Sequence, residues 1–376
     1  MIEPADFMKE LQFHGTEFFT GVPDSLLKSL CAYITDTVDQ KQHIIAANEG
    51  GAIGLASGYH LASRTIPFVY MQNSGQGNTV NPLLSLADEE VYKIPILLCV
   101  GWRGEPQTKD EPQHIKQGKV TASLFEAMGI PYQILSSDRE EMIAQVQEAY
   151  TSMKERSAPY ALLIRKNTFA EYELKNNVLV SGSFTREEVL RVILQSLEEE
   201  AIVVSTTGMA SREVYELRQE RGEGHEKDFL TVGSMGHTSQ IALGIALKKP
   251  NRQVVCIDGD GSALMHLGGM AIIGTLGLNN YLHIIINNGA HDSVGGQPTV
   301  GRVVDFLGVA QSLGYQSVKR IESLDELQEY LAQEHKGPAC VEVIVKKGNR
   351  SDLGRPKTTP VENKEAFMEY VAKDFV

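Results

Sequence analysis

Gly259-Asp260-Gly261-Ser262, followed later by Asn287-Asn288-Gly289, is the strongest motif in the sequence. An apolar run precedes each motif, Val254–Ile257 in the first case and Tyr281–Ile286 in the second. Runs of this length and composition are typical of buried strands. We therefore expect both motifs at the carboxyl edge of a parallel sheet, where open α/β domains bind their ligands.

The residue types in these two motifs suit a metal-bound diphosphate. Glycines allow backbone amides to approach a phosphate, and the following helix presents its N-terminus to negative charge. Asp260 offers a hard oxygen ligand, while Asn288 and the backbone carbonyl of Ala290 offer two more, which is a set that Mg²⁺ prefers. The alternative is two unrelated tight turns. The sequence contains no Gly-Lys-Ser/Thr phosphate loop and no Gly-x-Gly-x-x-Gly motif that opens a helix.

A repeated pattern organises the chain into two halves. With an offset of 186 residues, the separation of Phe68 and Val254, the stretch Phe68–Gly75 aligns with Val254–Gly261. The same offset aligns Ala56–Leu61 with Ala242–Leu247, and Ile96–Val100 with Leu282–Ile286. This pattern predicts two similar α/β domains, each a parallel sheet flanked by helices. The alternative is a chance similarity, because Gly and Ala are frequent residues. Strand-like runs are Ile66–Met71, Ile94–Val100, Tyr160–Arg165, Ala201–Ser205, Gln253–Ile257, Tyr281–Ile286 and Ala339–Val345.

Composition limits the possible classes of protein. The 376 residues suit two α/β domains, with 42% apolar and 22% charged residues. A net charge of −13 disfavours nucleic acid and anionic membranes as partners. The acidic start of the chain and the short apolar runs predict neither a secretion signal nor a membrane span, so we expect a cytoplasmic protein. The scattered Cys31, Cys99, Cys256 and Cys340 are interpreted as buried, reduced thiols.

The spacing Gly-Asp-Gly…Asn-Asn resembles the signature of the thiamin-diphosphate-dependent enzymes. This resemblance implies a pyrimidine-binding domain over residues 1–175 and a pyrophosphate-binding domain over residues 184–376, with no middle domain. The polar segment Lys175–Ser183 lies between them. Implied cofactors are thiamin diphosphate and Mg²⁺, and the implied assembly is a homodimer or higher homo-oligomer with the cofactor at the subunit interface.

In the family a glutamate of the pyrimidine-binding domain precedes a Gly/Ala-rich helix. Asn48-Glu49-Gly50-Gly51-Ala52 fits that pattern, so the resemblance implies that Glu49 activates the cofactor. A carboxyl group in that place can share a proton with a ring nitrogen of the pyrimidine. The alternative is that Glu49 is an acid in a helical first turn, where the helix dipole favours it.

Further cofactor contacts are expected around the second half of the repeat. Met235 aligns with Glu49 under the offset and is the candidate for the apolar side chain that keeps the cofactor bent, although a methionine at a helix start also suits a plain core position. The complete set of expected cofactor-binding residues is Glu49, Thr207, Gly208, Met235, Gly236, His237, Gly259, Gly261, Ser262 and Asn288.

The size of the chain and the absence of a middle domain restrict the resemblance to two groups of the family. These are the phosphonopyruvate decarboxylases and the fused sulfopyruvate decarboxylases. The stretches that look like the phosphonopyruvate enzymes are Gly21–Ser25, Gln72–Asn78, Gly101–Pro106, Asp110–His114, Thr207–Glu213 and Asp352–Pro356. The implied reaction converts 3-phosphonopyruvate into phosphonoacetaldehyde and carbon dioxide. Alternatives are another short 2-oxo acid such as sulfopyruvate, a synthase that couples the carbanion to an aldehyde, and a non-catalytic diphosphate-binding subunit.

Cations and proton carriers must complete such a site. A phosphonate needs cationic donors, for which Arg103, Lys109 and Arg355 are candidates, with His114 and Lys357 also in loop-like stretches. Each of these also suits an exposed surface charge. For the protonation step the candidates are Asp24, Ser25 and His114, with His291 as a rival, and the alternative for both histidines is a structural loop position.

Overall fold

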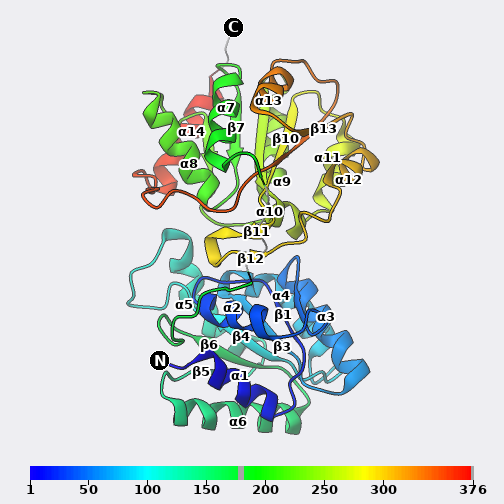
Figure 1. Ribbon diagram of the computed structural model, residues 1–376, viewed down its shortest axis with the longest axis vertical. Helices are drawn as coiled ribbons and strands as arrows, with labels where there is room; N and C mark the ends of the chain where they lie inside the picture. The colour runs from blue at the N-terminus through cyan, green and yellow to red at the C-terminus, as the bar shows by residue number, and fades with distance from the viewer. Residues whose placement is uncertain (177–181, 374–376) are drawn as a thin grey trace. The chain divides into compact units, whose positions relative to one another are not determined.

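A computed structural model describes residues 1–176 and 182–373. Within this part the chain forms two compact units, one comprising residues 1–176 with 291–297 and the other residues 182–290 with 298–373 (Figure 1). The expected boundary segment Lys175–Ser183 lies partly outside the described residues. Each unit is built around a six-stranded sheet, and all its recorded strand pairings are parallel.

The sheet of the first unit has the order β2-β1-β3-β4-β6-β5. Its central strands are buried apolar runs, as expected where helices cover both faces of a parallel sheet. Phe68 pairs with Leu97 and Gln72 with Gly101, so β3 and β4 end at the same edge. The strands are β1 (Phe19–Gly21), β2 (His43–Ile45), β3 (Phe68–Gln72), β4 (Leu97–Gly101), β5 (Tyr132–Ile134) and β6 (Tyr160–Ile164).

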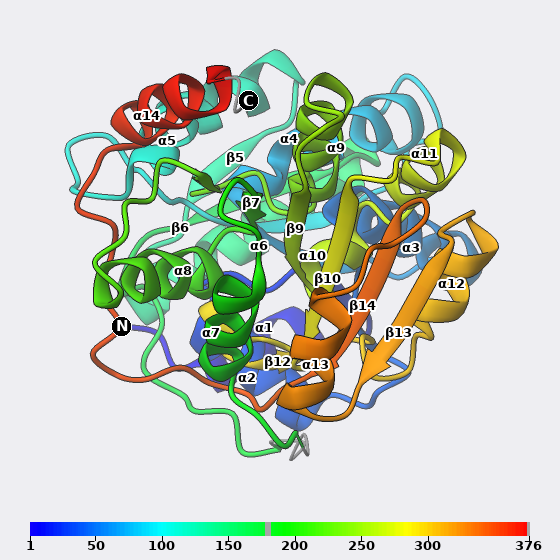
Figure 2. The ribbon, with the colours of Figure 1, turned by 90° about the horizontal axis from the view of Figure 1, so that it is seen from above.

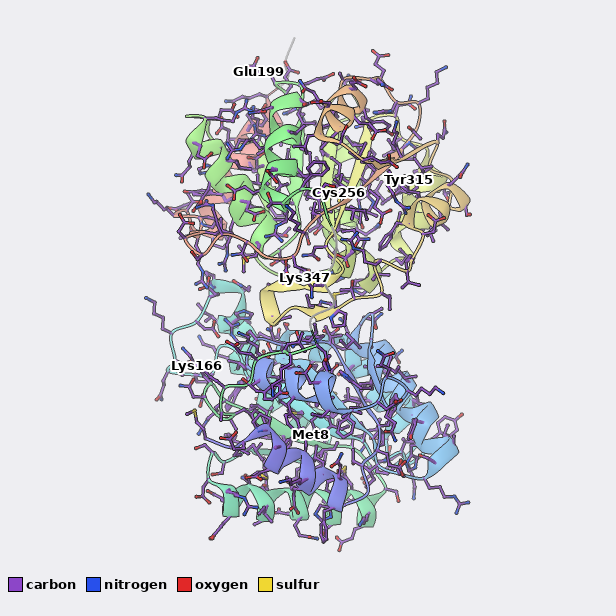
Figure 3. All side chains as sticks on the ribbon, viewed as in Figure 1. Met8, Lys166, Glu199, Cys256, Tyr315 and Lys347 are labelled. Atoms are coloured by element: carbon purple, nitrogen blue, oxygen red, sulfur yellow. The ribbon has the colours of Figure 1, made fainter. Side chains whose placement is uncertain are left out.

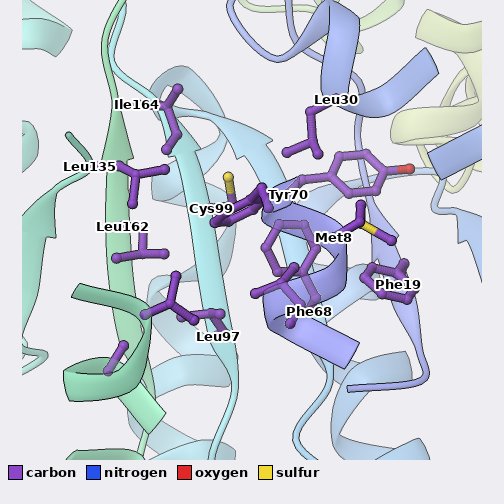
Figure 4. Packing of buried hydrophobic residues seen from close by; sticks show 14 of the residues in the cluster. Met8, Phe19, Leu30, Phe68, Tyr70, Leu97, Cys99, Leu135, Leu162 and Ile164 are labelled. Atoms are coloured by element: carbon purple, nitrogen blue, oxygen red, sulfur yellow. The ribbon is translucent and has the colours of Figure 1, made fainter. Parts of the chain in front are cut away.

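Helices cover both faces of this sheet. On one face, α1, α2 and α6 enclose the core shown in Figure 4, where Phe68, Leu97 and Leu162 project from neighbouring strands. The other face packs against α3, the π-helical segment η2 and α5. Full burial of one such side chain contributes roughly 1.5–3 kcal/mol to folding. The helices are α1 (Pro4–Phe13), α2 (Lys28–Thr37), α3 (Glu49–Ser63), η1 (Asn73–Gly75), α4 (Gln76–Pro82), η2 (Leu83–Ala87), α5 (Pro112–Ala127) and α6 (Arg139–Arg156).

The second unit has the sheet order β13-β14-β10-β9-β7-β8, and its strands β9, β10, β14 and β13 lie side by side in Figure 2. Ile286 of β10 pairs with Gly259 of β9, which brings the two sequence motifs to one edge. The strands are β7 (Ile202–Ser205), β8 (Asp228–Leu230), β9 (Val254–Gly259), β10 (Tyr281–Asn287), β13 (Ser317–Ile321) and β14 (Ala339–Ile344), with the short β11 (Ala290–His291) and β12 (Gln297–Pro298) apart from this sheet.

Two apolar clusters hold the helices of the second unit to its sheet. One joins α7, α8 and α13 to one face, and the other joins α9, α10, α11, α12 and α14 to the opposite face. The helices are α7 (Arg186–Ser196), α8 (Met209–Glu220), α9 (Thr238–Lys248), α10 (Asp260–Met265), α11 (Gly269–Leu276), α12 (Phe306–Ser312), α13 (Leu324–Leu331) and α14 (Pro360–Ala372), while the short η3 (Asp292–Val294) belongs to the first unit.

The two sheets share one strand order. Read from its other end, the second sheet is β8-β7-β9-β10-β14-β13, which matches β2-β1-β3-β4-β6-β5 position by position. The equivalent strands β3 and β9 begin at Phe68 and Val254, which are 186 residues apart. The expected fold class of two similar parallel α/β domains is therefore confirmed, and each of the seven strand-like runs overlaps a strand.

The four cysteines are free and buried, as predicted. Among the described residues, no helix combines the length and the apolar character that crossing a bilayer requires.

Candidate functional site

Asp260 and Asn288 lie together at the carboxyl edge of the second sheet. Asp260 begins α10 directly after β9, and Asn288 follows β10, the neighbouring strand. The backbone amide of Asn288 donates a hydrogen bond to the Asp260 carboxylate, and so does the hydroxyl of Thr299. The Asn288 side-chain oxygen accepts a hydrogen bond from the backbone N–H of Ala290 at 3.0 Å. The three predicted metal-ligating residues therefore form one cluster.

The Asp260 carboxylate is almost completely buried. Only 2% of the residue is exposed, and burial raises its pKa to about 6 in spite of the Thr299 and Asn288 hydrogen bonds. Gly301 packs so closely that a Cβ there would overlap the carboxylate. A buried carboxylate beside an amide oxygen has the donor chemistry of a Mg²⁺ site.

Three turns of the second unit converge on Ser262. Its Oγ accepts hydrogen bonds from the backbone N–H of Gly236 and from the Thr206 hydroxyl, both at 3.1 Å. Gly236 has φ 87°, and a Cβ there would lie 2.7 Å from the His266 ring, so the turn requires glycine. The turns after β7, β8 and β9 thus form a compact set of backbone and hydroxyl groups suited to a diphosphate.

The other predicted cofactor-binding residues of this unit occupy the same turns. Gly208 has φ 95° and precedes α8, with the partly buried Thr207 before it. Met235 is partly buried, and His237 is exposed, with its ring centroid 4.5 Å from that of His266. Gly259 ends β9, and the buried Gly261 lies in α10.

Glu49 is the first residue of α3 in the first unit. Asn48 caps this helix, because its side-chain oxygen accepts the N–H of Gly51 at 2.8 Å. Glu49 is only 5% exposed, and its Oε2 accepts a hydrogen bond from Nδ2 of Asn78 at 2.7 Å. A Cβ on Gly75 would overlap its carboxylate. Glu49 therefore occupies a helical first turn, as the alternative reading expected, but with a buried and oriented carboxylate.

A second polar cluster of this unit follows β1 and β4. Arg103 donates from Nη1 to the Ser25 hydroxyl at 2.8 Å and from Nε to Asp110 Oδ2 at 2.8 Å. Asp110 also accepts the backbone N–H of Gly104 at 2.7 Å, and the Arg103 guanidinium helps to hold the pKa of this carboxyl below its usual value. Asp110 thus fixes the orientation of Arg103 and of the loop after β4.

Asp24 is fully buried beside this cluster. Nε2 of Gln72 donates to its Oδ1 at 2.6 Å, and the backbone N–H of Leu26 donates to its Oδ2 at 2.9 Å. A Cβ on Gly101 would overlap this carboxylate. Burial raises the pKa of Asp24 above its ordinary value, which suits a group that takes up or releases a proton.

His114 corrects one expectation, because it lies in α5 rather than in a loop. Pro112 begins the helix with a preset φ, so the turn that contains His114 is helical. Its ring is buried, and burial, together with the positive charge of Arg103, lowers its pKa to about 4. No described residue forms a hydrogen bond with its Nδ1.

The remaining candidates are more scattered. Lys109 and Arg355 are exposed, the first in the loop after β4 and the second between β14 and α14. Lys357 is also exposed and lies in the same loop as Arg355. His291 is partly buried in the two-residue strand β11, not in a loop.

Comparisons with known proteins identify the two halves of the chain. The sequence model described as "Thiamine pyrophosphate enzyme, N-terminal TPP binding domain" matches residues 5–124, and that of the C-terminal TPP binding domain matches residues 206–343. A phosphonopyruvate decarboxylase of Streptomyces viridochromogenes is 34% identical over 394 aligned positions, covering 99% of this chain and 95% of the relative. The chain belongs to the phosphonopyruvate decarboxylase family of thiamine pyrophosphate enzymes.

Two further relatives place the chain within this family. The phosphonopyruvate decarboxylase of Streptomyces hygroscopicus is 33% identical, with 99% of this chain and 95% of the relative covered. A sulfopyruvate decarboxylase of Methanosarcina acetivorans is 26% identical, with 94% of each chain covered. Along nearly the whole chain, the two phosphonopyruvate enzymes are thus more similar to it than this sulfopyruvate enzyme.

The hydrogen bonds of the structure add residues that the sequence analysis did not select as site residues. Asn78 and Gln72 orient Glu49 and Asp24, and both belong to a polar run directly after an apolar strand, which is a usable signal. Asp110 lies seven positions after Arg103 in a loop, which is a weaker signal. Thr299 reaches Asp260 from a distant segment, and no local pattern marks it.

Proposed function

We propose that the protein is a thiamin-diphosphate- and Mg²⁺-dependent enzyme that converts 3-phosphonopyruvate into phosphonoacetaldehyde and carbon dioxide. The observation that carries this proposal is the similarity to two phosphonopyruvate decarboxylases along almost the whole chain. The donor chemistry of the described clusters supports it, since a carboxylate, an amide and glycine turns suit a metal-bound diphosphate.

Asp260, Asn288 and the carbonyl of Ala290 are the proposed Mg²⁺ ligands. Support comes from the buried Asp260 carboxylate and its hydrogen bond with the amide of Asn288. The proposed diphosphate contacts are Thr207, Gly208, Gly236, His237, Gly259, Gly261 and Ser262, with Met235 as the apolar support under the cofactor rings. The convergence of three strand-end turns on Ser262 supports this assignment.

Thiamin diphosphate, when bound, supplies a carbon nucleophile and accepts the electron pair that carbon dioxide leaves behind. Glu49 is proposed to hold a proton against a ring nitrogen of the pyrimidine. Its buried carboxylate, oriented by Asn78 and packed against Gly75, can do this without the rotamer freedom of a surface acid.

The Asp24, Ser25 and His114 side chains are proposed to deliver the proton that completes the product. Asp24 has a raised pKa, and His114 is uncharged near neutral pH because its pKa is about 4. His114 must therefore first accept a proton before it can donate one, whereas a protonated Asp24 can donate directly. His291 remains the alternative donor.

Arg103, Lys109 and Arg355 are the proposed partners of the phosphonate. Asp110 and Ser25 hold the guanidinium of Arg103 in a fixed orientation. Asp110 partly offsets the charge of Arg103, so a dianionic substrate group has to compete with that carboxylate.

We further propose that a homodimer is the smallest active unit, with Glu49 of one chain and the Asp260 cluster of its partner on one cofactor. Helix α3 supports this, since its exposed face carries Gly54, Leu55, Gly58 and Leu61. A Cβ added to Gly54 or Gly58 would meet no described atom within 4 Å, so this chain alone imposes no steric need for glycine there. The proposed domains remain 1–175 for the pyrimidine and 184–376 for the pyrophosphate, and the four free cysteines suit the reducing cytoplasm.

The test is an assay of carbon dioxide and phosphonoacetaldehyde release from phosphonopyruvate, with thiamin diphosphate and Mg²⁺ added together, singly or not at all. Sulfopyruvate and pyruvate serve as comparison substrates. We expect turnover only with both cofactors, and the highest kcat/KM for phosphonopyruvate. A higher kcat/KM for sulfopyruvate, or turnover without thiamin diphosphate, would overturn the proposal.

A further inference from the structure

Cys256, Asp258 and His283 form a compact buried cluster in the second sheet. Cys256 and Asp258 lie on β9, two positions apart and therefore on one face, and His283 pairs with Cys256 from β10. Within the described part of the chain, one potential ligand atom of each residue lies within 4.8 Å of the other two. Figure 3 labels Cys256 within the second unit, together with the neighbouring Tyr315.

His283 is the unusual member of this cluster. Its Nε2 lies 3.5 Å from Oδ2 of Asp258, which is long for a hydrogen bond, and no described residue provides Nε2 with a hydrogen bond. The residue has no exposed surface, so water does not reach this nitrogen from the solvent. A buried polar nitrogen without a partner is costly and calls for a specific explanation.

The separation of His283 and Asp258 is that of two ligands around one metal ion. Metal–ligand distances of about 2.0–2.3 Å place two ligands of a tetrahedral ion roughly 3.3–3.8 Å apart. The separation of 3.5 Å between His283 Nε2 and Asp258 Oδ2 falls in this range. Asp258 uses its other oxygen, Oδ1, to accept the backbone N–H of Gly259 at 3.0 Å, which fixes the direction of Oδ2.

The hydroxyl of Tyr315 supplies an outer contact of the kind that metal ligands usually have. Nδ1 of His283 lies 3.3 Å from the hydroxyl of Tyr315, so a proton on Nδ1 leaves Nε2 free as a ligand. The Tyr281 hydroxyl lies near Cys256 but donates its proton to the carbonyl of Ser239 at 2.9 Å. The Tyr315 contact therefore orients the imidazole.

We propose that Cys256, Asp258 and His283 bind one transition-metal ion of the Zn²⁺ class. A thiolate, an imidazole and a carboxylate suit Zn²⁺ or Co²⁺ and are a poor set for Mg²⁺, which prefers oxygen ligands. Binding removes the thiol proton of Cys256, which passes to the solvent, and forms bonds to sulfur, nitrogen and oxygen. The ion cross-links β9 and β10 just before Asp260 and Asn288, and so holds the strand ends that carry them.

The experiment measures metal content in the full-length, tag-free protein. Cells are grown with added Zn²⁺ or Co²⁺, the protein is dialysed against EDTA, and bound metal per chain is determined by mass spectrometry. We expect one equivalent of metal that survives dialysis, and in the Co²⁺ protein an absorption band from thiolate-to-metal charge transfer. Substoichiometric metal in both preparations, or Co²⁺ bound without a thiolate band, would overturn the proposal.

Matched variants assign the ion to this cluster. Cys256→Ser and His283→Gln should lose the metal. Cys340→Ser should retain it, because Cys340 is equally buried and pairs with His283 from β14 but lies outside the cluster. Asp260→Asn should also retain it, which separates this ion from the proposed Mg²⁺. Loss of metal in Asp260→Asn but not in Cys256→Ser would contradict the assignment, whatever the enzymatic activity.

Discussion

The backbone amide of Asn288 donates a hydrogen bond to the carboxylate of Asp260, which joins the ends of two neighbouring strands, β9 and β10. The carboxylate is buried, and the Thr299 hydroxyl donates a second hydrogen bond to it. A hard cation is the partner that best compensates such a group.

Asp260→Asn should therefore lose metal-dependent cofactor binding while remaining folded. The substitution keeps the shape of the side chain but removes the charge that Mg²⁺ needs. Removing a residue that only supports a metal ligand lowers metal affinity roughly 10–100-fold. Because Asp260 is proposed to be a ligand itself, we expect its loss to lower Mg²⁺ affinity by more than this. Titration calorimetry with thiamin diphosphate and Mg²⁺ measures it. Asp325→Asn, on the exposed surface of α13, is the matched control, and equal affinities in the two variants would count against a ligand role.

Glu49→Gln should abolish most activity without unfolding the protein. Glutamine can still accept the Asn78 hydrogen bond but cannot share a proton with a ring nitrogen, so we expect kcat to fall roughly 10²–10⁴-fold. Steady-state carbon dioxide release and the melting temperature are the two readouts. Glu140→Gln, in the first turn of α6, tests the helix-dipole alternative. Similar small effects of both substitutions would support that alternative.

Gly75→Ala should impair the same step through geometry alone. The added methyl group would overlap the Glu49 carboxylate and turn it away from Asn78. We expect kcat to fall by roughly tenfold or more, because small misplacements of a catalytic group are costly. Gly77→Ala is the control, since a Cβ there meets no described atom within 4 Å. An active Gly75→Ala enzyme would mean that the position of Glu49 is less restricted than the packing indicates.

His114 should make the stability of the protein depend on pH. Its pKa is lowered by burial from 6.5 to about 4, so between these values the unfolded chain binds more protons than the folded one. Stability should accordingly fall as the pH drops from 6.5 toward 4, and His114→Gln should lose less over that range. Urea denaturation of both proteins at a series of pH values tests this. Parallel pH profiles for the two proteins would refute the assignment.

Much of the fold could be predicted because its central strands are apolar runs bounded by glycine turns. β9 and β10 were found in this way, and the offset between β3 and β9 identified the repeat. The strands β1, β2, β5 and β8 have only three residues each. This is too few for an alternation of apolar and polar residues to be recognised.

The candidate site was predictable where its residues follow a strand directly. Asp260, Asn288 and Asp24 all lie at or just beyond strand ends, where a parallel sheet gathers side chains. Thr299 was not found because a long-range contact brings it to Asp260. Asp110 lies only seven positions after Arg103, but the loop between them has no regular pattern that marks it. The Cys256, Asp258 and His283 cluster was missed for a similar reason, since strand pairing creates it and no spacing motif accompanies it.

Complementation between two inactive variants tests the central claim, which is that Glu49 of one chain and the Asp260 cluster of another serve one cofactor. Glu49→Gln and Asp260→Asn chains are denatured together, refolded and assayed for carbon dioxide release from phosphonopyruvate. Half of randomly paired dimers are mixed, and each mixed dimer then has one intact site, so activity should recover to about a quarter of the wild-type value. If both groups came from the same chain, every site in the mixture would carry one defect. A mixture that contains mixed dimers but is as inactive as the separate variants would therefore contradict the account.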